Sequence, residues 1–258
     1  MPEFTIDDLV DCTLDSGKAA MDVYNREHAV SHKADQSPVT EADLLVDRIV
    51  VDALSARYPK VPVVTEERSA SHDLAACGDR FFLVDPIDGT KEFIRQTGEF
   101  TINIALIENG QPVAGIVYAP AIDRLFLGQN ESGAREIQPD GNVTHITVRP
   151  KGADTVAVAS RSHLTEETKN FLDANKIENC VNAGSSLKFC LVAAGEADIY
   201  PRFGPTMEWD TAAGHAVLAA AGGRVLTCDG TPLNYGKTAF RNPFFIASSP
   251  TTSYTMPV

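Results

Sequence analysis

The most informative stretch of this chain is FFLVDPIDGT, residues 81–90. Its apolar first half predicts a buried strand, and its second half places Asp85 and Asp88 where that strand ends. Pro86 stiffens the exit and Gly89 permits a tight turn, after which a short helical turn would offer free N–H groups to an anion. Because ligands of layered folds bind at strand ends, the stretch indicates a site. A plain Asp-Pro-x-Asp-Gly surface turn is the alternative.

Three more acidic side chains stand where elements are expected to begin or end. Glu66 follows a short apolar strand, Asp210 opens an apolar helix and Asp43 begins a helix. Each also has a structural explanation. Asp210 can cap its helix, and Asp43 can complete a capping box with Thr40. Glu66 can be one of two solvated acids. Both interpretations stay open for all three residues at this stage.

Together these carboxylates form a ligand set without His or Cys, which suits a hard cation such as Mg²⁺ or Mn²⁺. Enough of them are present for two cations. Two Mg²⁺ ions about 3.5–4 Å apart can clamp a phosphate, activate a water and stabilise the leaving oxygen. Phosphate monoesters are among the bonds that hydrolyse most slowly without a catalyst, so their hydrolysis needs strong electrostatic stabilisation of this kind.

The first part of the chain is expected to hold two helices and then an antiparallel meander. The helices are predicted over residues 5–30, where Thr5 and Asp8 resemble a capping box, and over 40–58. Two β-like runs, 100–108 and 112–120, flank an Asn-Gly pair, the strongest short hairpin signal.

From about residue 153 strands and helices alternate, which is typical of an α/β arrangement. The break near Pro150 therefore predicts a boundary. Residues 1–152 would form an α+β part, N-terminal helices with an antiparallel sheet, that holds the metal site. Residues 153–258 would form an α/β part that binds substrate. The two parts are expected to pack so tightly that they can be counted as one domain.

Composition limits the partners. The 258 residues contain 22 Lys and Arg against 35 Asp and Glu, a formal charge of −13. This balance argues against a nucleic acid polymer, which needs a positive footprint, but leaves a small phosphorylated ligand open. The five Cys show no Cys-x-x-Cys spacing, which favours free thiols in a reducing compartment. With no signal-peptide pattern and no apolar run long enough for a membrane span, we expect a cytoplasmic protein.

Several motifs resemble those of the inositol monophosphatase superfamily, which comprises Mg²⁺-dependent, lithium-sensitive phosphatases. They are TEE (65–67), DPIDGTKEFI (85–94), GSSLKFC (184–190), YPRFGPT (200–206) and WDTAAGHAV (209–217). The resemblance covers almost the whole chain and is strongest to the 3′(2′),5′-bisphosphate nucleotidases of the CysQ type. It implies a layered α/β/α/β/α sandwich, in agreement with the change of character near residue 150.

The resemblance also implies a ligand set for two or three Mg²⁺ ions, which Mn²⁺ can replace. Glu66, Asp85 and the backbone carbonyl of Ile87 would hold the first ion. Asp85, Asp88 and Asp210 would hold the second, so that Asp85 bridges the two.

Four residues acquire catalytic roles through the same resemblance. Glu66 and Thr90 would orient the attacking water. Asp43 would accept a hydrogen bond from Thr90. The backbone N–H groups of Gly89 and Thr90 would cradle the phosphate.

The second half should select the substrate. The helix start at Gly184 and the nearby Lys188 offer anion contacts, and Arg202 precedes a rigid loop. By resemblance Ser185, Lys188 and Arg202 line a nucleotide site; a helix cap at Ser185 and a solvated Lys188 are the alternatives. The residues expected to contact substrate are Glu66, Ile87, Asp88, Gly89, Thr90, Ser160, Gly184, Ser185, Lys188, Arg202 and Asp210.

The expected activity is removal of the 3′-phosphate of adenosine 3′,5′-bisphosphate, giving AMP and phosphate. The sulfated nucleotide is a further candidate substrate, which would place the enzyme in sulfur assimilation and nucleotide recycling. An inositol monophosphatase-like or sugar phosphatase is the alternative within the class. A non-catalytic acidic metal-binding module lies outside it, but Thr90 would then have no task. A phosphoenzyme mechanism, a monomer or a homodimer, and peripheral association with the cytoplasmic face of the inner membrane also stay open.

Overall fold

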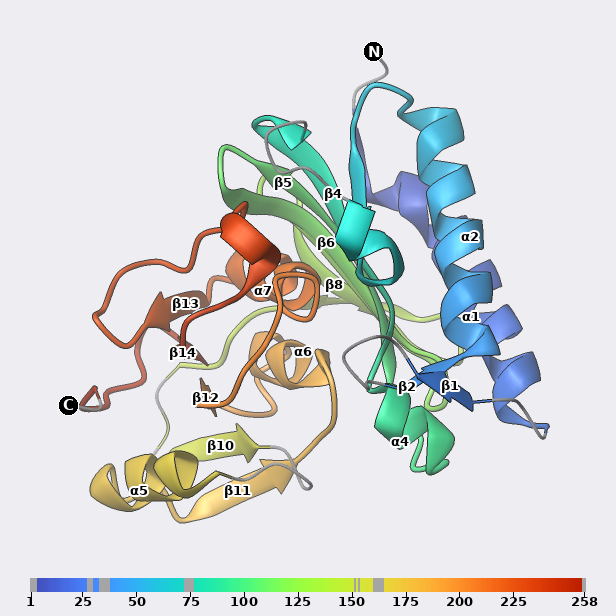
Figure 1. Cartoon of the computed structure of the whole chain (residues 1–258). Coiled ribbons are helices and arrows are strands. Elements are labelled where there is room, and N and C mark those ends of the chain that lie inside the picture. Colours follow the sequence, from blue (N-terminus) through green and yellow to red (C-terminus); the bar gives the residue numbers. More distant parts are fainter. Residues whose placement is uncertain are drawn as a thin grey trace.

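The computed structural model describes residues 4–26, 30–32, 38–71, 77–150, 152, 154–159 and 165–256. Within them the strands form three sheets (Figure 1). A hairpin joins β1 (Val30–His32) and β2 (Pro38–Thr40). The largest sheet has the order β3-β4-β5-β6-β7-β8-β9. Its strands are β3 (Val63–Thr65), β4 (Arg80–Asp88), β5 (Thr101–Glu108), β6 (Gln111–Ala119), β7 (Arg124–Gln129), β8 (Gly133–Ile137) and β9 (Val143–Ile146).

The second sheet has the order β11-β10-β12-β14-β13. Its strands are β10 (Val156–Ala159), β11 (Asn179–Asn182), β12 (Ile199–Arg202), β13 (Arg224–Thr227) and β14 (Phe245–Ser248). β10 is parallel to both its neighbours, whereas β14 runs antiparallel to β12 and β13. In the first sheet only the β3–β4 pair is parallel, and the other pairs are antiparallel. An antiparallel meander was expected from the sequence, although strand β8 within it was not predicted.

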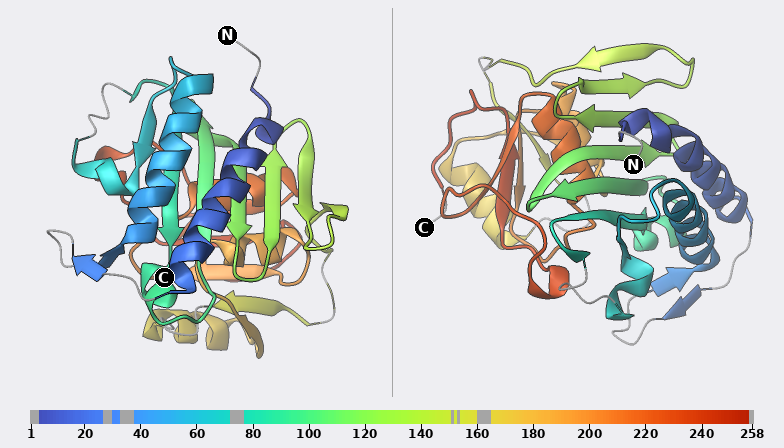
Figure 2. Two further views of the ribbon diagram at one scale, coloured as in Figure 1. Left: turned by 90° about the vertical axis from the view of Figure 1, so that its right-hand side faces the viewer. Right: turned by 90° about the horizontal axis from the view of Figure 1, so that it is seen from above.

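The helices complete five layers (Figure 2). α1 (Val10–Tyr24) and α2 (Glu41–Arg57) cover the outer face of the first sheet. α6 (Leu187–Ala193) and α7 (Ala212–Ala220) lie between the sheets, and α5 (Glu166–Ala174) covers the outer face of the second. The short elements are η1 (Ile6–Leu9), η2 (Glu66–Ser71), α4 (Thr90–Ile94) and η3 (Thr238–Phe240). The α/β/α/β/α prediction is therefore confirmed.

Side chains of strand β4 point alternately into the two apolar layers on either face of the first sheet. Phe82 and Val84 pack toward α1 and α2, whereas Phe81 and Leu83 pack toward α6 and α7. All four side chains are at most 2% exposed. Because successive side chains of a strand point to opposite faces, an apolar run of this length belongs to a sheet covered on both sides.

Helix α7 approaches the first sheet unusually closely, through two glycines on neighbouring strands. A Cβ atom at Gly115 would lie 2.4 Å from the carbonyl oxygen of Ala213, and one at Gly128 would lie 2.5 Å from the Cα of Val217. Real Cβ atoms do not approach so closely, so only glycine fits at both positions. The two glycines therefore set how closely α7, which follows Asp210 in the chain, packs on the first sheet.

The first N-terminal helix differs from expectation in three respects. Thr5 makes no side-chain cap, η1 precedes α1, and α1 ends at Tyr24 rather than near residue 30. Asp8, the expected partner of Thr5, instead accepts hydrogen bonds from Arg57 and Tyr58. The capping-box prediction was therefore wrong here, because a tertiary ion pair takes the acidic partner.

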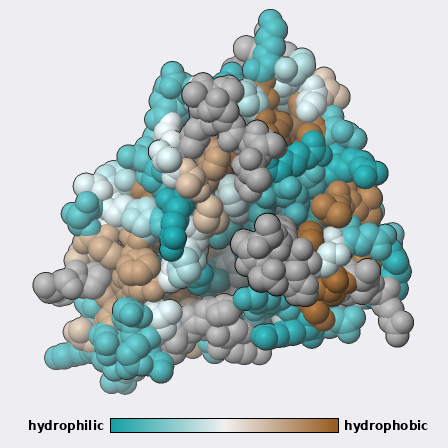
Figure 3. Space-filling model, in the orientation of Figure 1, coloured by the Kyte–Doolittle hydropathy of each residue, from teal (hydrophilic) through white to brown (hydrophobic). Residues whose placement is uncertain are grey.

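The boundary expected near residue 152 lies between β9, the last strand of the first sheet, and β10, the first strand of the second sheet. Helices α6 and α7 come from the second half yet share one apolar core with the first sheet. The division into two domains stays a prediction. Among the described residues, no helix has the length and apolar character needed to cross a bilayer. Hydrophilic side chains cover most of the face seen in Figure 3, in keeping with the acidic composition.

Candidate active site

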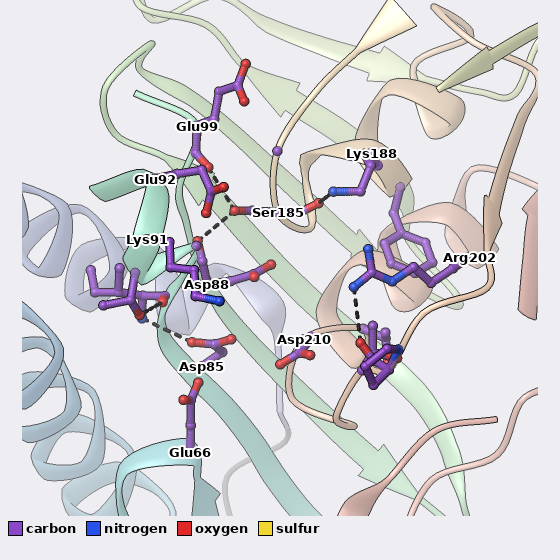
Figure 4. A pocket seen from close by; sticks show the side chains of 18 of the residues that line it. Glu66, Asp85, Asp88, Lys91, Glu92, Glu99, Ser185, Lys188, Arg202 and Asp210 are labelled. Carbon is purple, nitrogen blue, oxygen red and sulfur yellow. Dashed lines mark hydrogen bonds between the residues drawn. The ribbon is translucent and has the colours of Figure 1, made fainter. Parts of the chain in front are cut away.

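A cavity of about 430 Å³ collects most of the predicted site residues from both halves of the chain. It is lined by the end of β4, by α4, by the turn before α6, by β12 and by the segment before α7. Figure 4 shows acidic side chains on one side of it and Lys188 and Arg202 on the other. Sequence motifs from the two halves of the chain therefore meet in one place.

Three carboxylates converge at one end of the cavity. Glu66 begins η2, Asp85 lies in β4 and Asp210 precedes α7. One carboxylate oxygen from each lies within 4.8 Å of the others, and they point toward one another in Figure 4. Burial, followed by repulsion from neighbouring acids, raises the pKa values of Asp85 and Asp210 well above the ordinary carboxyl value. Such crowding of buried negative charge fits a site for a hard cation, which oxygen ligands favour.

Strand β4 is irregular where it delivers these acids. Asp85 pairs with Asn103 and Asp88 pairs with Thr101, so β4 carries one more residue than β5 between the two pairs. Bulges of this kind bend a strand and redirect its side chains. The Asp85 carboxylate turns back to accept a 3.1 Å hydrogen bond from the backbone N–H of Ile87. The Asp-Pro-Ile-Asp segment is thus part of the sheet and not a surface turn.

Asp88 is oriented differently from the other acids. Its Oδ2 accepts hydrogen bonds from the backbone N–H of Ser186 at 2.7 Å and from the Ser186 hydroxyl at 3.1 Å. Burial raises the pKa of Asp88, although Lys188 and these hydrogen bonds oppose the increase. Asp88 therefore lines the cavity without joining the three-carboxylate group, and Ser186 is a contact that the sequence did not single out.

The turn after Asp88 depends on glycine. Gly89 has φ 95°, in the left-handed region. A Cβ atom there would lie 2.5 Å from the Ser185 hydroxyl oxygen and 3.0 Å from the Glu99 carbonyl oxygen. The residue therefore allows both the turn into α4 and the close approach of the turn before α6.

Thr90 and Asp43 are connected as the resemblance implied. The Thr90 hydroxyl lies 3.1 Å from Oδ1 of Asp43 and 3.2 Å from the Ile87 carbonyl oxygen. The other oxygen of Asp43 completes a capping box by accepting from the Thr40 backbone N–H at 2.7 Å and hydroxyl at 2.6 Å. The capping box predicted for Asp43 is therefore confirmed, and the same carboxylate also contacts Thr90. Burial raises its pKa.

The basic end of the cavity is built by α6 and β12. Lys188 is only 4% exposed, donates a 2.7 Å hydrogen bond to the Ser185 carbonyl and lies over the Tyr200 ring. Desolvation lowers its pKa to about 8, with Asp88 the largest charge opposing that shift. The solvated-lysine alternative is wrong, and Lys188 lies nearer the acids than its sequence context indicated. Arg202 donates to the Pro205 carbonyl at 3.1 Å.

The turn Gly184–Ser186 connects the two ends. The Ser185 hydroxyl lies 2.7 Å from the Asp88 carbonyl oxygen and 2.9 Å from that of Glu99, so it does not cap α6. A Cβ atom at Gly184 would lie 2.6 Å from Glu99. These two residues therefore fasten the second half onto the first. Ser160, also expected at the site, lies outside the described residues.

Charge at the cavity is unbalanced. Six acidic side chains line it, namely Glu66, Asp85, Asp88, Glu92, Glu99 and Asp210, against the three basic side chains of Lys91, Lys188 and Arg202. An anion entering such a cavity would meet net repulsion unless cations were bound. Two divalent cations would more than offset the excess. Bound cations would therefore lower the repulsion that a phosphate meets in this cavity.

Comparison with known proteins agrees with this geometry. The model of the inositol monophosphatase family matches residues 6–252. The 3′(2′),5′-bisphosphate nucleotidase CysQ of Escherichia coli (strain K12) is 44% identical over 246 residues, covering 94% of this chain and 99% of that protein. Its namesake from Aggregatibacter actinomycetemcomitans is 34% identical, covering 93% of this chain and 91% of the relative.

Solved structures show the same similarity. The crystal structure of CysQ from Bacteroides thetaiotaomicron, a bacterial member of the inositol monophosphatase family, has a TM-score of 0.82 and 38% identity, covering 96% of this chain and 97% of that one. An IMPase from Thermotoga maritima has a TM-score of 0.78 and 28% identity, covering 95% and 92%. Sequence, fold and acidic cluster agree: the chain belongs to the inositol monophosphatase family.

Proposed function

We propose that this chain hydrolyses the 3′-phosphate of adenosine 3′,5′-bisphosphate, giving AMP and phosphate. The observation that carries the proposal is the division of one cavity, in which Lys188 and Arg202 lie across from Asp85 and Asp88, while Lys91 lies on the side of the acids. A substrate with two phosphates matches that division, since one can react at the acids while the other binds Lys188 and Arg202. Similarity to bisphosphate nucleotidases over nearly their full length supports the same assignment.

We assign the metal-binding role to Mg²⁺, with Mn²⁺ as a substitute. Glu66, Asp85 and the Ile87 carbonyl are proposed to hold one ion, and Asp85, Asp88 and Asp210 the other. Oxygen-only ligands and the crowding of carboxylates near Asp85 support this choice. When bound, the ions supply charge neutralisation of the phosphate and a more acidic water.

The attacking water is proposed to be oriented by Glu66 and Thr90. Both oxygens within reach of the Thr90 proton, on Asp43 and Ile87, are acceptors. Thr90 must therefore donate to one of them, and its own oxygen can only accept a hydrogen from the water. Glu66 can accept the second hydrogen, which leaves a lone pair of the water free to face the phosphorus.

The phosphate that reacts would lie against the N–H groups of Gly89 and Thr90. The remote phosphate and ribose would contact Gly184, Ser185, Lys188 and Arg202. Binding energy from the remote phosphate can position the reacting one, so it can raise turnover as well as affinity.

Several finer assignments are part of the same proposal. The sulfated form of the nucleotide is a second candidate substrate, and the enzyme would then serve sulfur assimilation. We also propose a cytoplasmic location, which the five free cysteines support.

The deciding experiment is phosphate release from adenosine 3′,5′-bisphosphate, inositol 1-phosphate and AMP, each with Mg²⁺ and after metal removal. We expect Mg²⁺-dependent turnover with a clear preference for the bisphosphate. Preference for inositol 1-phosphate would replace the proposal by the inositol phosphatase alternative. No release from any substrate would leave the acidic metal-binding module.

A further inference from the structure

The inward face of α2 carries two buried carboxylates one helical turn apart. Asp43 is 2% exposed and Asp47 is 4% exposed. Residues four apart in a helix lie on the same face, so both side chains point toward the first sheet. Asp43 binds Thr90, as described above. Asp47 instead binds Arg68: Nε donates to Oδ2 at 2.8 Å, and Nη2 lies 2.6 Å from the same oxygen.

Arg68 lies two residues after Glu66 in the short helix η2. Its backbone N–H donates to the hydroxyl of Thr65 at 3.2 Å, which closes a turn around Glu66. Thr65 itself is held in β3, where it pairs with Val84 of β4. Glu66 thus lies between an anchored strand end and an anchored arginine. Unlike Asp85, it is partly exposed, so the sheet alone does not fix its direction.

From this arrangement we infer that the Asp47–Arg68 ion pair is a positioning device for Glu66. On the proposed function, on which this inference rests, α2 holds both groups that orient the attacking water. Asp43 places Thr90, and Asp47 places Glu66 through Arg68, so one rigid helix sets the separation of the two groups that orient the attacking water. Asp47 and Arg68 touch neither substrate nor water in this scheme and act only through Glu66.

The Asp47–Arg68 pair is expected to contribute more to the orientation of the Arg68 side chain than to the stability of the fold. The cost of burying the Asp47 carboxylate away from water offsets much of its attraction to Arg68. The net stabilisation of the folded chain by the pair is therefore small. Two guanidinium nitrogens on one carboxylate oxygen nevertheless restrict the orientation of the arginine side chain. A defect in the pair should therefore appear in catalysis and metal binding before it appears in unfolding.

The test uses Asp47→Asn, Arg68→Gln and the double variant, all of which keep polar side chains but remove the charges of the pair. We expect turnover of adenosine 3′,5′-bisphosphate to fall by about tenfold to a hundredfold in each single variant, as for partners that orient metal ligands. The KM should change little, because the substrate contacts stay intact. The double variant should be no worse than the single ones, since the two residues act as one unit. Arg68→Lys should restore part of the loss.

A second readout is binding of Mn²⁺ alone, measured by calorimetry, which should weaken in Asp47→Asn and Arg68→Gln. The matched control is Arg57→Gln. Arg57 pairs with Asp8 at the C-terminal end of the same helix, and neither of these two residues lines the cavity. It should lose comparable stability in thermal unfolding but keep turnover and Mn²⁺ binding.

The outcomes separate the inference from the proposed function. Unchanged turnover and Mn²⁺ binding in Asp47→Asn, or equal losses in Arg57→Gln, would overturn the positioning role. If the unaltered chain released no phosphate, the proposed function would fail. Mn²⁺ binding that is weakened only in the Asp47 and Arg68 variants would then still support the positioning of Glu66.

Discussion

Ser186 connects the two halves of the site through Asp88. Its backbone N–H and hydroxyl both approach Oδ2 of Asp88, at 2.7 and 3.1 Å, while the hydroxyl lies 2.6 Å from the carbonyl oxygen of Asp210. Ser186 is 1% exposed. One residue of the second half therefore orients an acid of β4 and holds the segment that carries another acid. Oδ1 of Asp88 is the oxygen that we propose binds a cation.

We therefore expect Ser186→Ala to lower Mg²⁺ affinity by about tenfold, the lower end of the range for residues that orient metal ligands. The measurement is the Mg²⁺ concentration that gives half-maximal phosphate release. Ser249→Ala is the matched control, because it removes another buried serine hydroxyl, bonded to the Arg149 carbonyl away from the cavity. Equal shifts in both variants would mean that the effect is one of general stability.

Asp85→Asn should abolish turnover while making the metal-free protein more stable. Asp85 is buried and repelled by Glu66, Asp88 and Asp210, so its charge is costly without cations. Removing that charge should raise the Tm of the metal-free chain. Mg²⁺ should then stabilise the unaltered protein more than the variant. Full turnover of Asp85→Asn at saturating Mg²⁺ would contradict the two-metal assignment.

The same raised pKa predicts how this difference depends on pH. Near the ordinary carboxyl value of 3.8, Asp85 becomes protonated in both states and its cost disappears. As pH rises, the unfolded chain releases the proton first, so the folded metal-free protein loses stability until its own raised pKa is passed. The Tm advantage of Asp85→Asn should therefore grow from about pH 4 toward neutrality. A constant advantage across this range, in dialysed protein, would argue against a raised pKa.

Gly115→Ala tests whether the depth of α7 controls the site. The added Cβ would lie 2.4 Å from the Ala213 carbonyl oxygen, so the helix must move outward. Overpacking of this kind costs about 1–3 kcal/mol in the free energy of unfolding. Because Asp210 directly precedes α7, Mg²⁺ binding should weaken as well. Gly133→Ala is a suitable control for the loss of a glycine in the same sheet, as its Cβ would meet nothing within 4 Å, although its φ of 75° adds some strain.

Local signals were strong enough to predict much of the fold. The hairpin at Asn109-Gly110 forms as expected, with φ of 51° and 75° that few residues other than Asn and Gly adopt. The α2 cap at Thr40 also forms. Strand β8 was not predicted, because it buries Ala134 and a charged Glu136 and therefore lacks an apolar pattern.

The environment of individual side chains was less predictable where it depends on contacts between residues distant in sequence. The Glu136 carboxylate is buried because Arg124 binds it, and Asp47 because Arg68 binds it; neither partner is near in sequence. Similarly, nothing in the motif GSSLKFC distinguishes Ser185 from Ser186, although one binds carbonyl groups and the other binds Asp88. Such distinctions arise only once two distant segments pack together.

Lys188 provides the sharpest test of substrate selection. Its ammonium group is buried between Tyr200 and the Ser185 carbonyl, and it is the basic side chain most nearly enclosed by the cavity wall. We propose that it binds the phosphate that does not react. Lys188→Ala should then lower kcat/KM for adenosine 3′,5′-bisphosphate. The loss should correspond to an increase of about 1.5–3 kcal/mol in activation free energy, the range of a charged hydrogen bond.

Lys188→Met separates charge from packing, because methionine keeps an unbranched apolar stem beside Tyr200. It should show nearly the same loss on the bisphosphate and almost none on a small monophosphate that binds only at the acids. Since the pKa of Lys188 is about 8, kcat/KM of the unaltered chain for the bisphosphate should also fall as the amine loses its proton above that pH. The methionine variant should lack this decline. Equal losses on both substrates would place Lys188 at the reacting phosphate, which its interaction with Asp88 makes a real alternative. No loss on either would remove it from the substrate site.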